Sequence, residues 1–302
     1  MSWRAWAAFA ALCVIWGIPY FLIKVAVAEV PPLLVAWCRV LLATGVLLPI
    51  AWQRGALGSL RGHTAALCAF ALAEFAIPFA VISCGEQWIS SSVTGILIAT
   101  VPLWVVLLAR SFGVHEPLGV RRLIGLALGF IGVVTLLGFG TISAPWGWVG
   151  VACMLIAAFG YAVGPLIIQR HLRELDAVGP LASSLAIALL LLTLPAMRVM
   201  PAHWPSAAAL ASLVVLGMLC TAIAMLLMFY LVNHAGASRA SLITYINPAV
   251  ASLLGIGLLH EHLGAGGLAA FGMILAGSWL ASRGAAQRPE PPSPSSHQPA
   301  RR

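Results

Sequence analysis

The sequence predicts an all-α membrane protein in which ten transmembrane helices form two inverted five-helix repeats. Three observations lead to this prediction. Only 8% of the 302 residues are charged, whereas soluble domains carry roughly 25% charged residues, so this chain cannot cover itself with a water-facing surface. Long apolar runs recur from one end of the chain to the other. Finally, a stretch of the first half returns, with changes, in the second half.

The apolar runs are long enough to cross a bilayer, because a membrane-spanning helix needs about 20 apolar residues. Ten runs meet this requirement, at residues 5–25, 33–52, 64–84, 91–110, 122–139, 146–168, 179–197, 207–231, 240–260 and 265–282. They are continuous rather than alternating, which excludes the strands of a membrane barrel. The segment 284–302 is rich in Pro and Ser and has no apolar face, so we expect a disordered cytoplasmic tail.

The basic residues predict the orientation, because cytoplasmic loops carry an excess of Lys and Arg. With a cytoplasmic N-terminus, 13 of the 16 basic residues fall on the cytoplasmic side. The exceptions are Lys24 and Arg198 on the opposite side and Arg39 within a span. Both termini are therefore expected in the cytoplasm of a multi-pass inner-membrane protein. A cleavable signal peptide ending near Ala28 is the alternative for the first span, although that run is longer than usual and carries Lys24.

An internal repeat divides the chain at about residue 139 into a first repeat, 1–139, and a second, 140–283. The stretch from Ser91 matches the stretch from Ser238: Pro102 matches Pro248 at a shift of 146, and His115-Glu116 match His260-Glu261 at a shift of 145. Such a shift covers five spans, and an odd number of spans inverts the second copy in the membrane. Inverted repeats with mid-span discontinuities are a recurring plan of secondary transporters.

At two places the sequence resembles a known family. The run WGIPYFLIKVAVAEVPPLLVAWCRVLLA is similar to the opening of the EamA branch of the drug/metabolite transporter superfamily, in which Trp-Gly precedes a lysine, a proline-bearing loop and an arginine. The matching residues here are Trp16, Gly17, Lys24, Pro31 or Pro32, and Arg39. SSSVTGILIATVPLWVVLLA, followed by HEPL and GLALGFIGVVTLL, resembles the fourth and fifth spans of the same family.

The resemblance covers residues 5–283 and implies two five-helix halves around a central cavity lined by spans 1–4 and 6–9. It also implies export of small metabolites or drugs. The second half departs from the opening motif, because Phe159-Gly160 replace Trp-Gly and span 7 carries no arginine. A binding site that needs matching groups from both halves is therefore not expected.

Glu74 is the first candidate for chemistry, because it lies in the middle of an apolar span. A charged side chain at this depth costs at least roughly 2.5–3.5 kcal/mol, so it should face a cavity or carry a proton. This favours proton coupling or cation binding, with a structural contact to a neighbouring helix as the alternative. Arg39 is expected to pair with Glu74 or Glu86, or to bind a substrate carboxylate. Lys24 either contacts substrate or reaches the membrane interface.

Other polar and aromatic residues complete the predicted site. The cavity lining is expected to include Trp16, Tyr20, Trp104, Tyr245 and Asn247, and the cavity mouth Glu86 and Gln87. For Asn247, capping of freed backbone is the alternative, and for the turn at Glu86 a plain solvated loop. The hinges are expected at the kinks of Pro19, Pro102, Pro165 and Pro248, because a proline inside a helix frees a carbonyl and bends the axis.

Several functions are excluded or disfavoured by what the sequence lacks. There is no GxxxxGK[ST] loop for ATP, and we expect no cofactor. His260-Glu261-His262 does not place two imidazoles on one helix face, so no metal site is expected. The six cysteines lie apart in apolar runs and are expected to pack as small apolar residues. No basic face for nucleic acid can be assembled from separate membrane loops.

The function predicted from these features is secondary transport of small metabolites, amino acids or drugs by alternating access, with export as the direction. Uptake by the same fold and a membrane-embedded enzyme acting on lipid are the alternatives; the enzyme would need a cluster of acids, and only eight scattered acids exist. The expected partners are a small-molecule substrate, membrane lipid and protons. Gly125 and Gly129 form a GxxxG pattern that permits close helix contact within the chain or in a homodimer.

Overall fold

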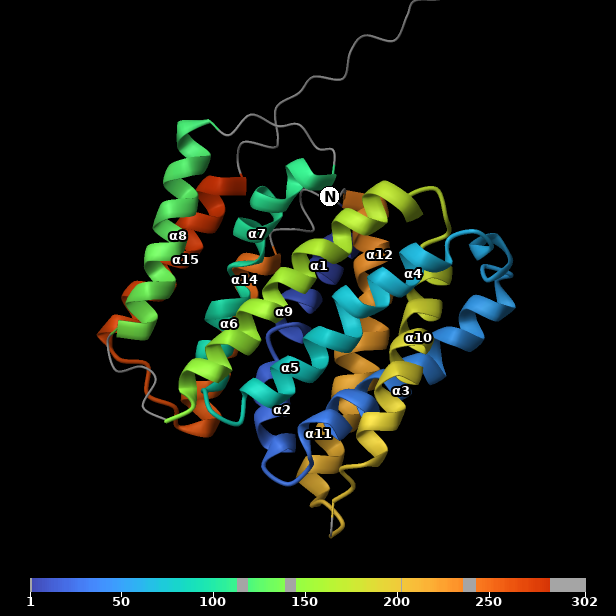
Figure 1. The fold of residues 1–302 in the computed structure, drawn as a ribbon, viewed down its shortest axis with the longest axis horizontal. Coiled ribbons are helices and arrows are strands. Elements are labelled where there is room, and N and C mark those ends of the chain that lie inside the picture. Colours follow the sequence, from blue (N-terminus) through green and yellow to red (C-terminus); the bar gives the residue numbers. More distant parts are fainter. Residues whose placement is uncertain (1, 113–118, 139–144, 202, 236–242, 283–302) are drawn as a thin grey trace, which may run out of the picture.

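The computed structural model describes residues 2–112, 119–138, 145–201, 203–235 and 243–282. The described residues form a bundle of apolar helices joined by short turns (Figure 1). The first half contains α1 (Trp3–Ile15), α2 (Pro19–Val27), α3 (Pro32–Gln53), η1 (Gly58–Leu60), α4 (Thr64–Phe70), η2 (Ala71–Ala76), α5 (Ile77–Gly85), α6 (Ser91–Ile98), α7 (Val101–Leu108), η3 (Ala109–Phe112) and α8 (Val120–Gly138). The second half contains α9 (Gly147–Ile167), η4 (Ile168–Leu172), α10 (Val178–Met197), α11 (Ala207–Gly217), η5 (Met218–Ile223), α12 (Ala224–Ala235), α14 (Ile243–Leu259) and α15 (Ala265–Ser282).

Eight of the helical stretches are long and apolar enough to cross a membrane. They are Trp3–Val27, Pro32–Gln53, Thr64–Gly85, Ser91–Leu108, Val120–Leu137, Gly147–Leu172, Val178–Met197 and Ala207–Leu231. Each agrees with a span predicted from sequence to within a few residues. The last two predicted spans correspond to shorter apolar helices, Ile243–Leu259 and Ala265–Ala281. The all-α prediction is therefore confirmed for the described residues.

Two faces of the bundle carry the helix ends. We call the face where α1 begins, with the connections 54–63 and 173–177, the Trp3 face. The face with the turns 28–31, 86–90, 198–206 and 260–264 is called the Glu86 face. Exposed tryptophans mark both: Trp3 and Trp52 on the first, Trp148 and Trp204 on the second. Tryptophans gather at membrane–water interfaces, so the two faces mark the edges of the apolar slab.

Helices α8 and α15 lie side by side at one edge of the bundle (Figure 1). Glycines bring their backbones together, because an added Cβ at Gly125 would lie 2.5 Å from the Ala281 amide nitrogen, and one at Gly277 would lie 2.4 Å from that of Gly129. The GxxxG pattern of Gly125 and Gly129 is thus used within the chain, against the last helix.

Two six-residue π-helical segments occupy corresponding places in the two halves. The segment η2 lies within the Thr64–Gly85 span, and η5 lies within the Ala207–Leu231 span. From Ala71 to Met218 and from Ala76 to Ile223 the separation is 147 residues. A π-segment widens one turn of an α-helix and is frequent at functional sites. The residues that the two segments present to the interior form the candidate site.

Candidate functional site

Arg39 is the buried cation of the site. It lies on α3 with 7% of its surface exposed. Its Nε donates a hydrogen bond to Thr221 Oγ1 at 2.8 Å, and its guanidinium carbon lies 3.7 Å from the centre of the Phe79 ring. The cation–π contact and the hydrogen bond hold the planar group in one orientation. Arg39 is thus anchored to Thr221 in the second half, and Glu74 is not its hydrogen-bond partner.

Glu74 is the mid-span acid, and it lies in the π-segment η2. Its carboxyl packs against Gly164 of α9, where an added Cβ would lie 2.1 Å from Oε2. That oxygen is buried and accepts no hydrogen bond from the described residues. Tyr161, also on α9, lies within electrostatic range of both Glu74 and Arg39. The acid, the cation and the tyrosine therefore form one polar cluster in the middle of the bundle, which we call the central cluster.

Thr221 takes the place of Glu74 in the second half. Because η2 and η5 are 147 residues apart, the residue corresponding to Glu74 is Thr221, whereas the 146-residue shift read from the sequence indicates Cys220. The Thr221 hydroxyl donates to Leu216 O at 2.8 Å while it accepts from Arg39. The site therefore has one ionisable group on the first π-segment and a neutral hydroxyl on the second.

The first span is interrupted at Trp16–Ile18, directly before Pro19. The break lets Gly17 approach α14 so closely that an added Cβ would lie 2.4 Å from Val250 Cβ. Asn247 of α14, with its amide turned to satisfy both neighbours, donates to Cys13 O at 3.2 Å and to Ile243 O at 3.1 Å. This contact fits the capping alternative for Asn247, because Cys13 O lies on the last turn before the break.

Trp16 is the first residue of the Trp16–Ile18 break, Tyr20 follows the break on α2, and the two side chains have different neighbours. Tyr20 is buried on α2 and lies within electrostatic range of Arg39 and Glu86, so it belongs to the wall of the central cluster. Trp16 is partly buried and packs against an apolar cluster that includes Leu12 of α1 and Leu231 of α12. At the first break, Tyr20 therefore contributes to the polar central cluster, whereas Trp16 contributes to an apolar cluster.

The fourth span is interrupted between α6 and α7, just before Pro102. Proline lacks the amide that would continue the helix, and the following amide of Leu103 bonds to Thr100 O at 2.9 Å. The freed Ala99 O accepts from the Ser278 hydroxyl of α15 at 2.8 Å, and Tyr245 Oη donates to Ser278 O at 3.3 Å. The other two predicted kink residues, Pro165 and Pro248, lie inside continuous helices.

Trp104 lies on the first turn of α7, directly after the Ala99–Thr100 break. Its ring makes edge-to-face contacts with Phe130 and Phe159, at 5.8 Å and 5.7 Å between centroids. Its indole nitrogen is buried without a partner among the described residues. Trp104 therefore packs between α8 and α9.

Lys24 and Glu86 meet on the Glu86 face. The Lys24 ammonium donates to Glu86 O and, at 2.8 Å, to Ile89 O, so it binds the backbone of the α5–α6 turn. The Glu86 side chain is fully buried, and Gln87 beside it is exposed. Burial raises the pKa of the Glu86 carboxyl, while Lys24 opposes this rise and Glu261 adds to it. Only Gln87 of the two predicted mouth residues lies at the surface.

Glu261 caps the N-terminus of α6 from the α14–α15 connection. Its carboxylate accepts from the Ser91 amide at 2.7 Å, the Ser92 amide at 2.9 Å and the Ser92 hydroxyl at 2.6 Å. A carboxylate at a helix N-terminus satisfies free amides and complements the helix dipole. The capping role explains Glu261 without a metal, and the described residues hold no metal-binding group of His, Cys, Asp or Glu. The matching residues His115-Glu116 lie outside the described residues.

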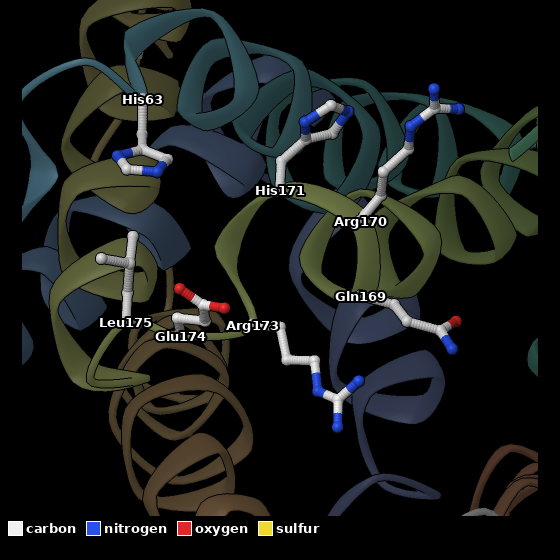
Figure 2. Close-up of a pocket in the computed structure, with 7 residues that line it drawn as sticks. All are labelled: His63, Gln169, Arg170, His171, Arg173, Glu174 and Leu175. Carbon is white, nitrogen blue, oxygen red and sulfur yellow. The ribbon is translucent and has the colours of Figure 1, made fainter. Parts of the chain in front are cut away.

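A basic pocket opens on the Trp3 face, away from the central cluster. It encloses about 790 Å³ and is lined by His63, Gln169, Arg170, His171, Arg173, Glu174 and Leu175. Figure 2 shows Glu174 pointing up toward His63, whereas His171 and Arg170 extend upward and Arg173 extends downward. Four of these side chains are basic, which matches the excess of basic residues that the sequence places on this side. A second pocket, of about 440 Å³, lies beside Glu29 and Trp204 on the Glu86 face.

Three residues of the site were not foreseen from sequence: Thr221, Phe79 and Tyr161. A threonine or a phenylalanine in an apolar span carries no signal of its own. Tyr161 did carry one, because the chain has only four tyrosines and a buried tyrosine usually needs a hydrogen-bond partner. Thr221 is indicated only by the structure, through the 147-residue separation of the two π-segments.

The apolar spans and the buried central cluster define a multi-pass membrane protein of the transporter class. The EamA-like transporter family model matches residues 3–138 and 148–283, so the chain belongs to this family and contains two copies of its repeat. It is 31% identical to "Uncharacterized inner membrane transporter YedA" of Escherichia coli (strain K12) over 84% of this chain and 82% of that protein. "Uncharacterized transporter YoaV" of Bacillus subtilis (strain 168) is 25% identical over 84% and 88%.

A solved crystal structure shows the same fold. It covers 92% of this chain and 97% of its own chain with a TM-score of 0.66, at 20% sequence identity. The family and the transporter relatives point to transport and away from a membrane-embedded enzyme.

Proposed function

We propose that this protein is a secondary transporter that moves small metabolites, amino acids or drugs across the inner membrane by alternating access, with export as the direction. Ten spans in two inverted halves would rock around the central cluster. The observation that carries the proposal is Arg39, a buried cation that joins α3 to η5 across the two halves by its 2.8 Å bond to Thr221. A group that links both halves at mid-depth can sense a solute and the relative position of the halves together.

Glu74 is proposed as the coupling residue. Its carboxyl has a buried oxygen without a hydrogen-bond partner among the described residues, and an ionised acid at this depth is costly. Binding a proton or a cationic solute would remove this cost, and release would restore it. The same group can therefore exchange one ligand for another during the transport cycle.

The breaks at Trp16–Ile18 and Ala99–Thr100 are proposed as hinges. Each is held by a side chain of the second half: Asn247 binds Cys13 O, and Ser278 binds Ala99 O. A broken helix bends at low cost once its freed carbonyls have partners. Pro19 and Pro102 prevent the helix from re-forming across these breaks.

The Trp3 face is proposed to be cytoplasmic. Arg54 and Arg61 lie in its connections, and Arg170 and Arg173 line its pocket. Lys24 and Arg198 lie toward the other face. A reporter enzyme that is active only outside the cytoplasm, fused after Gly264, should be active, whereas a fusion after Gly62 should be inactive. The reverse pattern would overturn the orientation.

The function is tested with purified protein in vesicles that carry a pH gradient. Amino acids and cationic drugs are screened for flux, and the accepted solute is then used with Glu74→Gln. We expect this variant to insert and bind solute but to lose gradient-driven accumulation. Glu29→Gln, an exposed acid on the Glu86 face, serves as the matched control and should transport normally. Full gradient-driven flux in Glu74→Gln would exclude the coupling role, and the sign of the driven flux separates export from uptake.

A further inference from the structure

Glu86 is a buried acid that the central cluster does not use. It ends α5 and begins the turn to α6, and its surface is 0% exposed. Neither carboxyl oxygen accepts a hydrogen bond from the part of the chain that the structure describes. Buried polar groups are nearly always hydrogen-bonded, so a carboxyl with two unpartnered oxygens needs an explanation.

The charged neighbours of Glu86 form their hydrogen bonds with groups other than its carboxyl. Lys24 of α2 spends two of its three N–H groups on the Glu86 and Ile89 carbonyls, so the ammonium binds backbone. Glu261, from the α14–α15 connection, accepts from two amides and a hydroxyl at the N-terminus of α6. Arg39 of α3 is in electrostatic range, but its Nε is bound to Thr221. None of these groups donates to the Glu86 carboxyl.

The remaining titratable groups nearby are a tyrosine and two thiols. Tyr20 of α2 lies within electrostatic range of Glu86. Cys84 precedes the turn, and Cys153 of α9 packs against Gly85. These groups are neutral near pH 7 and offer no countercharge. An ionised Glu86 would therefore be a buried charge without a hydrogen-bond partner, which is unfavourable even with Lys24 and Arg39 in electrostatic range, whereas a protonated Glu86 would avoid burying a charge.

The turn that holds Glu86 is tightly closed. An added Cβ at Gly150 of α9 would lie 2.7 Å from Ile89 Cγ2 and 3.0 Å from Gly85 O, so the turn lies directly on α9. Lys24 of the first span donates to the Ile89 carbonyl of the same turn. Glu261 of the second half accepts from the Ser91 amide at the start of α6. Water reaches Glu86 only if these contacts separate.

We propose that Glu86 is a second proton-binding site, which holds a proton while the Glu86 face is closed and releases it to water on that side when the face opens. The inference rests on the proposed alternating access but uses a different acid from Glu74, at a different depth. The proton comes from water on the Glu86 side and returns to it. Because the proton stabilises the closed form, acid on this side would favour closure.

Infrared difference spectroscopy tests the proposal without a substrate. Purified full-length protein in lipid vesicles is titrated, and the C=O stretch of protonated carboxyls is followed. In the wild type we expect a carboxyl band that persists above the pH at which exposed acids ionise, and this band should be lost in Glu86→Gln. Glu29→Gln, a variant of an exposed acid on the same face, should keep the band. Glu74→Gln is measured in parallel and should remove a separate band.

Hydrogen exchange of the α6 N-terminus gives the second readout. In the wild type, the protection of the amides around Ser91 and Ser92, after correction for base-catalysed intrinsic exchange, should fall once Glu86 ionises, whereas in Glu86→Gln it should not change with pH. If Glu86→Gln does not fold, Glu86→Asp keeps a carboxyl and should retain a shifted band. A band unchanged in Glu86→Gln, or α6 exchange with the same pH dependence in both proteins, would overturn the proposal. Neither result would bear on gradient-driven flux through Glu74.

Discussion

Arg39 and Thr221 join the two halves of the protein through a single hydrogen bond of 2.8 Å. The two residues are 182 positions apart, and both are buried. Thr221 occupies in the second half the place that Glu74 holds in the first. The candidate site is thus built on a corresponding pair of π-segments that carry unlike groups, an acid in the first half and an arginine-bound hydroxyl in the second.

Thr221→Val should destabilise the protein by about 1–2 kcal/mol, because the buried Arg39 Nε would lose its acceptor at nearly constant side-chain volume. Thr221→Ser keeps the hydroxyl and should behave like the wild type. The measurement is thermal unfolding of purified protein in detergent or nanodiscs. Equal stability of the Val and Ser variants would show that the bond contributes nothing.

Glu261→Ala should lower stability by about 1–3 kcal/mol, because three hydrogen bonds at the start of α6 would be lost, two of them to helix amides. Gly255→Ala should act through the same contact, because its Cβ would lie 2.2 Å from Glu261 Oε2 and 2.5 Å from Ser92 Oγ. Unfolding midpoints of the two single variants and the double variant measure the effect.

The double variant serves as the internal control. If Gly255→Ala acts by displacing the carboxylate, its effect should shrink when Glu261 is already alanine, so the two changes should not add. Strict additivity would mean that Gly255 is needed for another reason. Glu174→Ala, at an exposed acid on the Trp3 face, should leave the unfolding midpoint unchanged.

The spans could be predicted closely from sequence, because lipid imposes a simple rule of apolar length. The run 64–84, for example, corresponds to Thr64–Gly85. The π-segments inside such spans could not be predicted. Packing against neighbouring helices decides whether the backbone hydrogen bonds of a turn span four or five residues. The pattern of apolar residues in the sequence does not record this choice. The separation of the two π-segments, 147 residues, differs by one from the shift of 146 that matches Pro102 to Pro248.

Part of the candidate site could also be predicted. Glu74 and Arg39 were indicated because an ionisable residue in an apolar run is costly and therefore informative. Their partners were not, because Thr221, Phe79 and Gly164 look like ordinary membrane residues. Glu261 was seen as part of a loop, and its contact with α6 depends on a fold in which residues 169 and 170 positions apart meet.

A low pH should weaken the contact between the turn 28–31 and the N-terminus of α11. Glu29 accepts from the Ser206 hydroxyl and amide, both at 2.6 Å, and these bonds lower the pKa of its carboxyl below the ordinary 4.5. A lowered folded-state pKa means that this stabilisation is present above the unfolded-state pKa and is lost as the pH falls through the folded-state value.

Unfolding midpoints of the wild type and Glu29→Gln, measured from neutral pH downward, should therefore differ at neutral pH and converge in acid. Ser206→Ala removes the hydroxyl donor, so adding Glu29→Gln to this variant should change the midpoint at neutral pH by less than it does in the wild type. A gap that stays constant through the acid range would mean that the Glu29 charge is not involved.

The glycine contact between α8 and α15 predicts the outcome of adding one methyl group to α15. In Gly277→Ala the new Cβ would lie 2.4 Å from Gly129 N and 2.6 Å from Gly125 O, which are backbone atoms that cannot turn aside. We expect a loss of about 1–3 kcal/mol, as for other overpacked sites, and faster hydrogen exchange in both helices. Gly272→Ala is the matched control on the same helix, because its Cβ meets nothing within 4 Å. It should be neutral or slightly stabilising, since alanine favours helix by about 1 kcal/mol over glycine.

The mass of the particle, measured by light scattering with the detergent subtracted, should be the same for Gly277→Ala and the wild type, because these glycines pack within one chain. A halving of the mass in Gly277→Ala would instead assign the glycine face to a dimer.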